Sequence, residues 1–342
     1  MVSGKIISIG LIAYVLGMSS KKLHRWYKDV LSGFKQAEES GELQKHDMQK
    51  VEQGEFVDIA VPILEQKNLG KQMAVDEKTI NGTCYTVLSN RQTGKIALMA
   101  ATLKTKYLVD LMSHFDMEKR MQVKSISRDM ATHYDWFARE AFMNAYHVID
   151  KFHIMKNTME QLQAVRIYYR QQELSKRREA AENKKEYQET VLENGDSVLQ
   201  LLARSRGLLF VMPHNWSQQQ RQRANVLFKL FPKIKRAYQM VNKIRRWFKP
   251  PAGKITYQPT KNKKKTQLLD IINELYRSTI PELKNMAFML KRNLMNILHY
   301  FIAKETNAKA EALYQNLQRF ININYGTRNI KFFLFRIKTY FA

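Results

Sequence analysis

Apolar and polar residues follow four different patterns along the chain, and the first pattern lies near the N-terminus. Residues 11–16 are apolar, Gly17 can adopt a left-handed turn conformation, and residues 21–28 mix basic and apolar side chains. Ser19 or Ser20 can cap the second segment. This pattern predicts two short helices joined by a turn.

The predicted pair has the spacing of a helix-turn-helix, in which the second helix enters the major groove of DNA. Lys21, Lys22 and Arg25 would face phosphates or base edges, whereas Leu23 and Trp26 would pack inward. An ordinary helical hairpin with a basic face is the alternative.

The second pattern, between residues 71 and 150, is typical of an α/β domain. Apolar β-rich segments predict strands, and apolar residues three and four apart predict helices. The order is strand, strand, strand, helix, strand, helix, strand, at residues 71–76, 83–88, 95–100, 103–115, 123–127, 131–142 and 146–149. Residues 90–94 form a hairpin turn between the second and third strands. An aspartate stands at the C-terminal end of three predicted strands: Asp76, Asp129 and Asp150.

The remaining patterns are a long helical segment and a mixed C-terminal region. Residues 151–300 are rich in Lys, Arg, Gln and Glu at helical spacing, and after residue 300 an apolar helical stripe leaves Glu311 off its face. The whole chain predicts a mixed sheet flanked by helices, interrupted by an all-helical segment. The predicted divisions are a helix-turn-helix at 1–34, a linker and helix at 35–70, the first part of the core at 71–160, the helical segment at 161–300 and the last part of the core at 301–342.

The charge balance indicates a polyanionic partner. Lys and Arg number 57 against 31 Asp and Glu, so the formal net charge is +26. Such an excess costs self-repulsion in the compact state, and nucleic acid offsets it while releasing counterions. An anionic membrane surface and a basic surface without a partner are the alternatives.

Cysteine usage and hydropathy bear on the compartment. The single cysteine, Cys84, excludes an intramolecular disulfide framework and fits a reducing cytoplasm. No apolar run approaches the roughly 20 residues that a membrane span needs. Residues 6–16 are apolar and follow Lys5, as in a signal peptide, but no small-residue cleavage site comes after them. We expect a cytoplasmic protein with neither a membrane partner nor a small-molecule substrate.

Asp76 and Asp129 are placed where phosphodiester chemistry could use them. Cleavage needs an activated nucleophile and a counter-charge on the leaving oxygen, which two Mg²⁺ ions about 4 Å apart supply. Mg²⁺ takes carboxylate oxygens and keeps several waters, so three protein acids suffice. Because acids at the ends of neighbouring strands meet at one sheet edge, we expect these two to lie close together.

Each acid also has a purely structural interpretation. Asp76 could end a strand, with Glu77 as the ligand in its place, and Asp129 could cap the helix predicted from residue 131. Glu311 could be a solvated helix residue. The residue pattern alone leaves these alternatives open.

Five short motifs occur in order: MAVDE at 73–77, SRDM at 127–130, VIDKFH at 148–153, TNAKAE at 306–311 and YGTRNI at 325–330. In series they resemble the DDE transposases of bacterial insertion sequences, specifically the ISL-three family, over nearly the whole chain. The resemblance implies an RNase H-like catalytic core interrupted by a long helical insertion before the last acid. It also implies a DNA transposase that hydrolyses and joins strands at the terminal repeats of an insertion sequence.

The resemblance places the family's two aspartates on Asp76 and Asp129 and its glutamate on Glu311. These three are the implied catalytic residues and ligands of two Mg²⁺ ions, with Mn²⁺ as a substitute and Ca²⁺ as an inhibitor. Supporting positions are Asp150, His153 and Asn307, with a core or capping role as the alternative for the histidine. The positions expected to contact DNA are Lys21, Lys22, Arg25, Arg128, Lys151, Arg245, Arg246 and Arg328.

The implied partners are double-stranded DNA, as terminal inverted repeats and as target, and further copies of the chain, because two DNA ends must be joined. The expected location is the bacterial nucleoid. Family members often carry a cysteine-paired zinc ribbon before the helix-turn-helix, and this chain has none. That departure fits a shortened copy or one partner of a split reading frame, and it bears on autonomous recognition of DNA ends more than on chemistry.

Two functions from other classes compete with this interpretation. One is a catalytically inactive relic that still binds DNA, and the other is an RNase H-like nuclease that cuts but never joins.

The end of the helical segment mixes aromatic and basic residues. Trp247 and Phe248 lie among Arg245, Arg246 and other cations, an arrangement that can stack on exposed bases. The alternative is a helix with core aromatics and a basic face toward phosphates. Residues 261–265 are predicted as a flexible basic loop.

Overall fold

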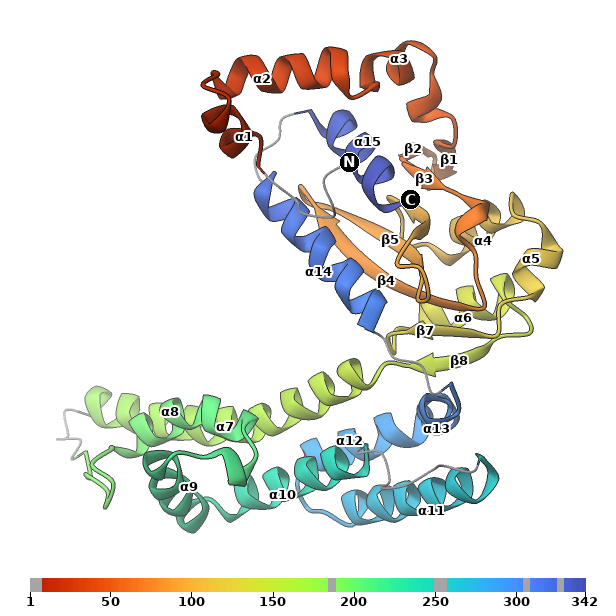
Figure 1. Ribbon diagram of the computed structural model, residues 1–342. Helices are drawn as coiled ribbons and strands as arrows, with labels where there is room; N and C mark the ends of the chain where they lie inside the picture. Colours follow the sequence, from red (N-terminus) through yellow and green to blue (C-terminus); the bar gives the residue numbers. More distant parts are fainter. Residues whose placement is uncertain (1–7, 184–188, 249–256, 304–307, 325–328) are drawn as a thin grey trace. The chain divides into compact units, whose positions relative to one another are not determined.

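The computed structural model divides the chain into two compact units (Figure 1). Unit 1 comprises Met1–Val148 and Ala303–Ala342, and unit 2 comprises Ile149–Ile302. The described residues are 8–183, 189–248, 257–303, 308–324 and 329–342, without the side chains of 257–261, 302, 303, 308, 310 and 311. The unit boundaries lie near the divisions predicted at residues 160 and 300.

Unit 1 has a mixed α/β fold, with a sheet flanked by helices. Its strands are β1 (Met48–Glu52), β2 (Glu55–Ile59), β3 (Ile63–Leu64), β4 (Gln72–Ile80), β5 (Thr83–Asn90), β6 (Ile96–Ala100), β7 (Ser125–Arg128) and β8 (Tyr146–Ile149). Its α-helices are α1 (Ile9–Val15), α2 (Ser20–Trp26), α3 (Phe34–Glu39), α4 (Thr105–Ser113), α5 (Met117–Met121), α6 (Thr132–Ala141), α14 (Ala308–Ile323) and α15 (Ile330–Phe341). A π-helical turn (Tyr27–Leu31) and 3₁₀ turns at Glu42–Gln44 and Gln66–Asn68 complete it.

The six-stranded sheet has the order β3-β6-β5-β4-β7-β8. β4 lies inside it, antiparallel to β5 and parallel to β7, where Ala74 pairs with Ser127. The predicted β5–β6 hairpin is confirmed. Its turn uses Gly94 at φ 72° and the Asn90 side chain, which accepts hydrogen bonds from the backbone N–H groups of Gln92 and Thr93.

Each face of the sheet carries its own apolar core (Figure 1). Side chains of β4 and β7 such as Met73 and Ile126 pack with α4 and α6 on one face. On the other face, Val87 of β5 packs with Leu317 and Phe320 of α14 and with α15. Burying each side chain of this size contributes about 1.5–3 kcal/mol. This packing joins the C-terminal helices to a sheet formed some 200 residues earlier in the chain.

The N-terminal helices rest on α15. Gly17 has the predicted left-handed conformation, with φ 62°, and Leu23 is buried as predicted. Trp26 was predicted to pack inward, but its side chain is 47% exposed because the rings of Tyr27 and Phe34 take the contacts with Phe332 of α15. Ser19 is the N-cap residue of α2, although its side chain forms no capping hydrogen bond.

The prediction of a linker and helix at residues 35–70 is wrong. Only the short helix α3 and two 3₁₀ turns are helical there, and β1 and β2 form an antiparallel hairpin. The hairpin turn consists of Gln53 and Gly54, both at positive φ, a conformation that suits two-residue hairpin loops. Charged residues along both strands concealed the alternation that predicts β structure.

Unit 2 is helical. Its α-helices are α7 (Lys151–Glu182), α8 (Val198–Phe210), α9 (Gln218–Leu230), α10 (Pro232–Trp247), α11 (Tyr257–Tyr276), α12 (Pro281–Arg292) and α13 (Leu294–Ala303), with a 3₁₀ turn at Pro213–Asn215. Within the described residues, no helix is both long and apolar enough to cross a membrane.

The basic loop predicted at residues 261–265 is instead part of α11. Lys264 is buried there, its ammonium 4.7 Å from the ring centroid of Phe301 and 5.3 Å from that of Trp247. Buried apolar residues at 268, 271, 272 and 275 continue the same helix, and their period of three to four residues extends it back through the lysines.

Candidate active site

Asp76 lies on β4, and Asp129 directly follows the last residue of the neighbouring parallel strand β7. Ala74 of β4 pairs with Ser127 of β7, so two further residues along each strand are Asp76 and Asp129. Side chains at matched positions of a parallel pair point to the same face of the sheet. The register therefore puts both carboxylates at one end of the β4–β7 pair.

Both carboxylates are half-buried and held by local backbone hydrogen bonds. One oxygen of Asp76 accepts from the N–H of Glu77 at 2.9 Å, and one oxygen of Asp129 accepts from the N–H of Ala131 at 2.8 Å. Ala131, not Asp129, is the N-cap residue of α6. Each carboxylate keeps acceptor capacity for a cation, because an ionised carboxylate offers about four lone-pair directions.

Asp76 faces the layer formed by α14 and α15. It pairs across β4 and β5 with Val87, which belongs to the core under these helices. Tyr314 of α14 donates a hydrogen bond of 3.4 Å to the carbonyl oxygen of Val87. Burial raises the pKa of Tyr314, and the negative charge of Asp76 raises it further. α14 thus packs directly against the strand pair that carries Asp76.

A second buried tyrosine lies on the opposite face. The hydroxyl group of Tyr134, from α6, lies 3.2 Å from the hydroxyl group of Thr86 on β5. Burial raises the pKa of Tyr134, with further contributions from the carboxylates of Glu77, Asp129 and Asp76. The strands that carry the two aspartates are therefore flanked by protonated phenols on both faces.

Lys78 shares a strand face with Asp76 because the two residues are two positions apart on β4. Burial lowers the pKa of the Lys78 ammonium, and the nearby charge of Asp76 partly offsets that effect. This lysine is the nearest cation to Asp76 along the strand, and the period-2 pattern could have identified it from the sequence.

The third predicted acid, Glu311, falls within α14, but its side chain lies outside the described residues. Among the side chains that the structure describes, no three His, Cys, Asp or Glu residues gather as a metal site. The β4–β7 register nevertheless brings two carboxylates to one side of the sheet, and such a pair fits a hard cation such as Mg²⁺, which prefers carboxylate oxygens. Asp76 and Asp129 are the described residues that could hold it.

Two of the three predicted supporting residues, Asp150 and His153, belong to the start of unit 2. Asp150 is the N-cap of α7, and its side chain accepts a hydrogen bond of 2.9 Å from the N–H of Phe152. His153 is half-buried, with its ring 5.6 Å from that of Phe152. Asp150 therefore caps the start of α7. Asn307 lies outside the described residues.

Several residues predicted to contact DNA are available at the surface. Lys21, Lys22 and Arg25 are exposed on α2, and Arg246 is exposed on α10. Lys151 is half-buried, with its ammonium 5.9 Å from the ring centroid of Phe248. Arg328 lies outside the described residues.

Arg128 has a structural position that contradicts a direct DNA contact. Its side chain is only 2% exposed and forms a salt bridge with Asp135 of α6. A second hydrogen bond of 2.9 Å runs to the carbonyl oxygen of Asp129. Burial lowers the pKa of the guanidinium, while the charges of Asp135 and Asp129 oppose that shift. Arg128 therefore anchors α6 beside the candidate site.

Arg245 and the neighbouring aromatics are also largely committed inside unit 2. Arg245 donates hydrogen bonds to the carbonyl oxygen of Phe210 at 3.0 Å and to the side chain of Asn242 at 3.1 Å. Trp247 and Phe248 are 5% and 1% exposed. Stacking of these rings on DNA bases is contradicted, and the alternative of core aromatics is correct.

The sequence interpretation missed the two tyrosines. Tyr134 follows Asp129 by five residues, in the first turn of α6, and Tyr314 follows Glu311 by three residues on α14. Their helical positions were visible, but their contacts with β5 depend on tertiary packing.

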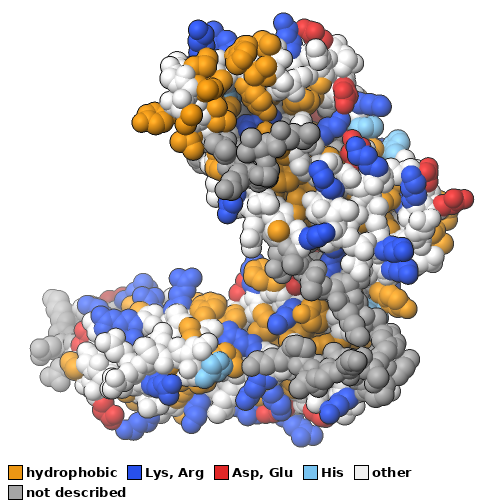
Figure 2. Space-filling view, in the orientation of Figure 1, with side chains coloured by type: hydrophobic (Ala, Val, Ile, Leu, Met, Phe, Trp, Pro, Cys, Tyr) orange, Lys and Arg blue, Asp and Glu red, His pale blue; other side chains and the backbone are white. Residues whose placement is uncertain are grey.

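An apolar surface covers part of the N-terminal helices (Figure 2). Tyr14 and Val15 of α1 are among its most exposed side chains, at 83% and 75%. Lys21, Lys22 and Arg25 lie on the next helix, so apolar and basic groups are neighbours in the sequence.

Residues 73–337 match a family model described as transposase, that of the ISL-three group of DDE transposases. No curated protein and no solved structure matches the chain. The matched region includes Asp76, Asp129 and Glu311 and spans most of both units. The chain therefore belongs to the ISL-three family of transposases.

Proposed function

We propose that the protein is a DNA transposase that cuts and joins strands at one carboxylate site formed by Asp76, Asp129 and Glu311. The observation that carries this proposal is the parallel register of β4 and β7, which aligns Asp76 with Asp129. Packing of α14 over the face of Asp76 supports the third position. Helical spacing puts position 311 on the same side of α14 as Tyr314.

The sheet supports an RNase H-like core. Strands β6, β5 and β4 run antiparallel in sequence, and β7 joins β4 in parallel on its other edge. Helices cover both faces, and the last helical pair returns from the end of the chain to cover the face of Asp76. Asp129 directly follows the carboxyl end of β7, and Asp76 lies inside β4, two residues beyond Ala74, which pairs with Ser127 of β7.

The three acids would hold two Mg²⁺ ions, with Mn²⁺ as a substitute. When bound, the ions supply an activated nucleophile and a counter-charge on the leaving oxygen. The protein's own contribution is position and environment. Backbone hydrogen bonds orient the two aspartates, and Tyr134 and Tyr314 form hydrogen bonds with β5 on opposite faces of the sheet. A fixed, partly dry site strengthens electrostatic interactions with the phosphate.

DNA binding would come from two basic regions. The pair α1–α2 would act as a helix-turn-helix, with Lys21, Lys22 and Arg25 toward the duplex. Unit 2 would bind the phosphodiester backbone of the DNA, because this unit contains 30 Lys and Arg against 12 Asp and Glu. Two DNA ends must be joined, so we expect a dimer or larger assembly.

Cleavage of a labelled terminal-repeat duplex tests the proposal. Wild-type protein with Mg²⁺ should cut the duplex, Ca²⁺ should permit binding without cutting, and Asp129→Ala should abolish cutting while keeping binding. Glu140→Ala is the matched control, since Glu140 is an exposed acid on α6. Equal cutting by wild type and Asp129→Ala would remove the catalytic assignment.

Two further outcomes identify the competing functions. Tight binding without any cutting by the wild type would indicate a catalytically inactive relic. Cutting without transfer of the new 3′ end to a second duplex would indicate a simple nuclease.

A further inference from the structure

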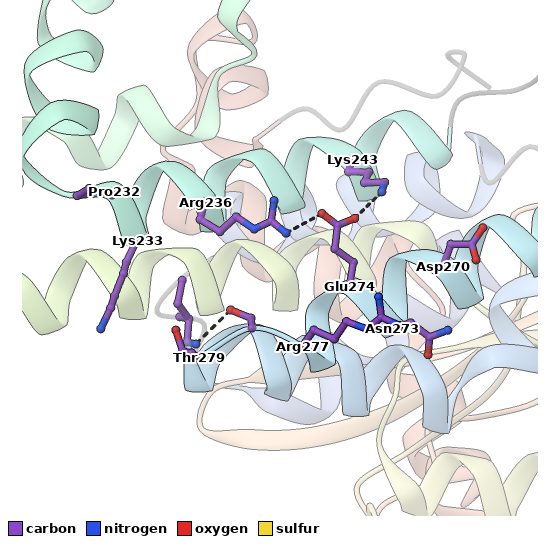
Figure 3. Close-up of a pocket in the computed structure, with 11 residues that line it drawn as sticks. Pro232, Lys233, Arg236, Lys243, Asp270, Asn273, Glu274, Arg277 and Thr279 are labelled. Carbon is purple, nitrogen blue, oxygen red and sulfur yellow. Dashed lines mark hydrogen bonds and ion pairs between the residues drawn. The ribbon is translucent and has the colours of Figure 1, made fainter.

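A charged groove of about 770 Å³ lies on unit 2 (Figure 3). One side is formed by α10, and the other by the end of α11 and the turn that leads into α12. Nine of the eleven residues that line the groove are charged or polar, and the other two are Pro232 and Ile280. A ligand bound there must be recognised through charge and hydrogen bonds.

Four cations and two acids line this groove. Lys233, Arg236 and Lys243 lie three and seven residues apart on α10, a spacing that puts them on one helix face. Arg277 follows the last residue of α11, and the acids are Asp270 and Glu274. The formal charge of the groove is therefore positive by two.

Glu274 holds two of the four cations. Its carboxylate forms salt bridges with Arg236 at 2.7 Å and with Lys243 at 2.5 Å, as the dashed lines in Figure 3 show. Lys243 and then Arg236 lower the pKa of Glu274. Both cations are nevertheless 45% exposed, so a second anion can reach them from solvent.

Lys233 and Arg277 are exposed and form no salt bridge with any acid that the structure describes. They are ready to bind an anion without displacing a protein carboxylate. The groove thus contains two cations without a salt bridge among the described residues, Lys233 and Arg277, and two cations that are paired with Glu274.

We propose that this groove binds the phosphodiester backbone of DNA and that Glu274 limits its affinity by competing with phosphates for Arg236 and Lys243. The proposal rests on the proposed function and names the face of unit 2 that holds DNA. Phosphates would first meet Lys233 and Arg277, and closer approach would exchange the carboxylate of Glu274 for a phosphate oxygen.

The dimensions fit this ligand. Lys233 and Lys243 are ten residues apart on α10, so they span about 15 Å along the helix axis. One strand of B-DNA carries a phosphate every 3.4 Å or so of axis, which gives about four phosphates over that length. A small anion would use only part of the groove, whereas a long polyanion matches both its length and the net charge of +18 on unit 2.

Salt-dependent binding of the full-length protein to a labelled duplex of arbitrary sequence tests this assignment, with EDTA present to prevent cutting. The slope of log affinity against log salt measures how many phosphates the protein neutralises, with about 0.9 per phosphate. Lys233→Ala and Arg277→Ala should each reduce the slope by about one. Glu274→Gln should increase the slope by about one, which is a tenfold change in affinity for each tenfold change in salt.

Two controls separate the groove from a general basic surface. Lys176→Ala removes an exposed cation that pairs with Glu173 on α7, and it should leave the slope unchanged. The double variant Lys243→Ala/Glu274→Gln keeps the groove charge at its original value and should restore the wild-type slope. Thermal melting of each variant identifies any that fails to fold. If a single variant fails, the salt slope of the double variant is compared with that of the wild type.

The groove assignment is overturned if Lys233→Ala and Arg277→Ala keep the wild-type slope, if Lys176→Ala loses as much as they do, or if Glu274→Gln binds no better. Preference for an acidic protein segment over the duplex would also overturn it. These results leave the proposed function standing as long as cutting still depends on Asp129. If the groove variants change the salt slope as expected but cutting does not depend on Asp129, only the proposed function is contradicted.

Discussion

The two units differ most in how they use charge. Unit 1 has 27 Lys and Arg against 19 Asp and Glu over 188 residues, whereas unit 2 has 30 against 12 over 154 residues. Unit 1 builds a sheet with an apolar core on each face, and the Arg128–Asp135 salt bridge lies beside the candidate site. Unit 2 has a formal charge of +18, so self-repulsion works against its helices until an anion binds.

Under the proposed function, this contrast corresponds to a division of labour. A catalytic carboxylate pair needs fixed positions, which a central sheet provides, while a polyanion needs a surface of cations, which helices display at regular intervals. The difference can be tested by changes that damage one unit and spare the other.

The largest effect is expected in unit 1, from Asp76→Asn. Loss of one carboxylate should reduce the cutting rate by about 10³-fold or more with little change in DNA affinity. Glu77→Gln is the matched control, because the next residue on β4 faces the opposite side of the sheet. A severe loss in Glu77→Gln with activity kept in Asp76→Asn would reverse the ligand assignment.

The largest stability effect is expected in unit 2, from Asp196→Asn. Asp196 is 2% exposed and binds Arg204 and Arg223, so its removal leaves two guanidinium groups with no carboxylate between them. The cost should be about 3 kcal/mol of unfolding free energy, measured by denaturant titration. Glu193→Gln breaks only an exposed pair with Lys229 and should cost less than about 1 kcal/mol.

A smaller effect is expected from Tyr314→Phe, which weakens the contact between α14 and the sheet. Loss of its hydroxyl group frees α14 from the carbonyl oxygen of Val87, beside Asp76. The Mg²⁺ concentration for half-maximal cutting should rise about three- to tenfold, which corresponds to roughly 1 kcal/mol, while the rate at saturating Mg²⁺ is kept. A fall in melting temperature with an unchanged Mg²⁺ requirement would restrict Tyr314 to a structural role.

As the pH falls, we expect the N-terminal helices of unit 1 to lose stability before unit 2 does. Burial lowers the pKa of His24 below its usual 6.5, so its contribution is complete above pH 6.5 and is lost as the pH falls through its folded value. Burial alone would raise the pKa of Asp196, but Arg223 and Arg204 hold it below its usual 3.8, so unit 2 keeps this contribution to lower pH. Hydrogen exchange should show α2 opening before α8, and His24→Gln should abolish the difference.

Local patterns predicted much of unit 1. Apolar β-rich segments and the Gly94 turn located the β4–β5–β6 meander. Asp76 was predicted to end its strand, but β4 continues to Ile80, so only Asp129 follows a strand end. Arg128 could not be predicted from the sequence, because its burial depends on Asp135 reaching it from α6.

The limits of local patterns are clearer in unit 2. A run of lysines was predicted as a loop, but Lys264 belongs to a helix and folds its stem between two aromatic rings. The same long side chain can lie in water or along apolar surface, and only tertiary packing decides between them. Trp247 and Phe248 became core residues for the same reason.

If the protein cuts and then joins DNA as proposed, the interior position of β4 limits how the site can adapt between the two chemical stages. With partners on both edges, this strand cannot slide or tilt without breaking ladders on either side, so Asp76 keeps its place from the first stage to the second. The incoming and outgoing strand ends must then exchange positions around a stationary carboxylate. Repositioning of the nucleic acid, rather than of the sheet, becomes the slow step to look for in single-turnover kinetics.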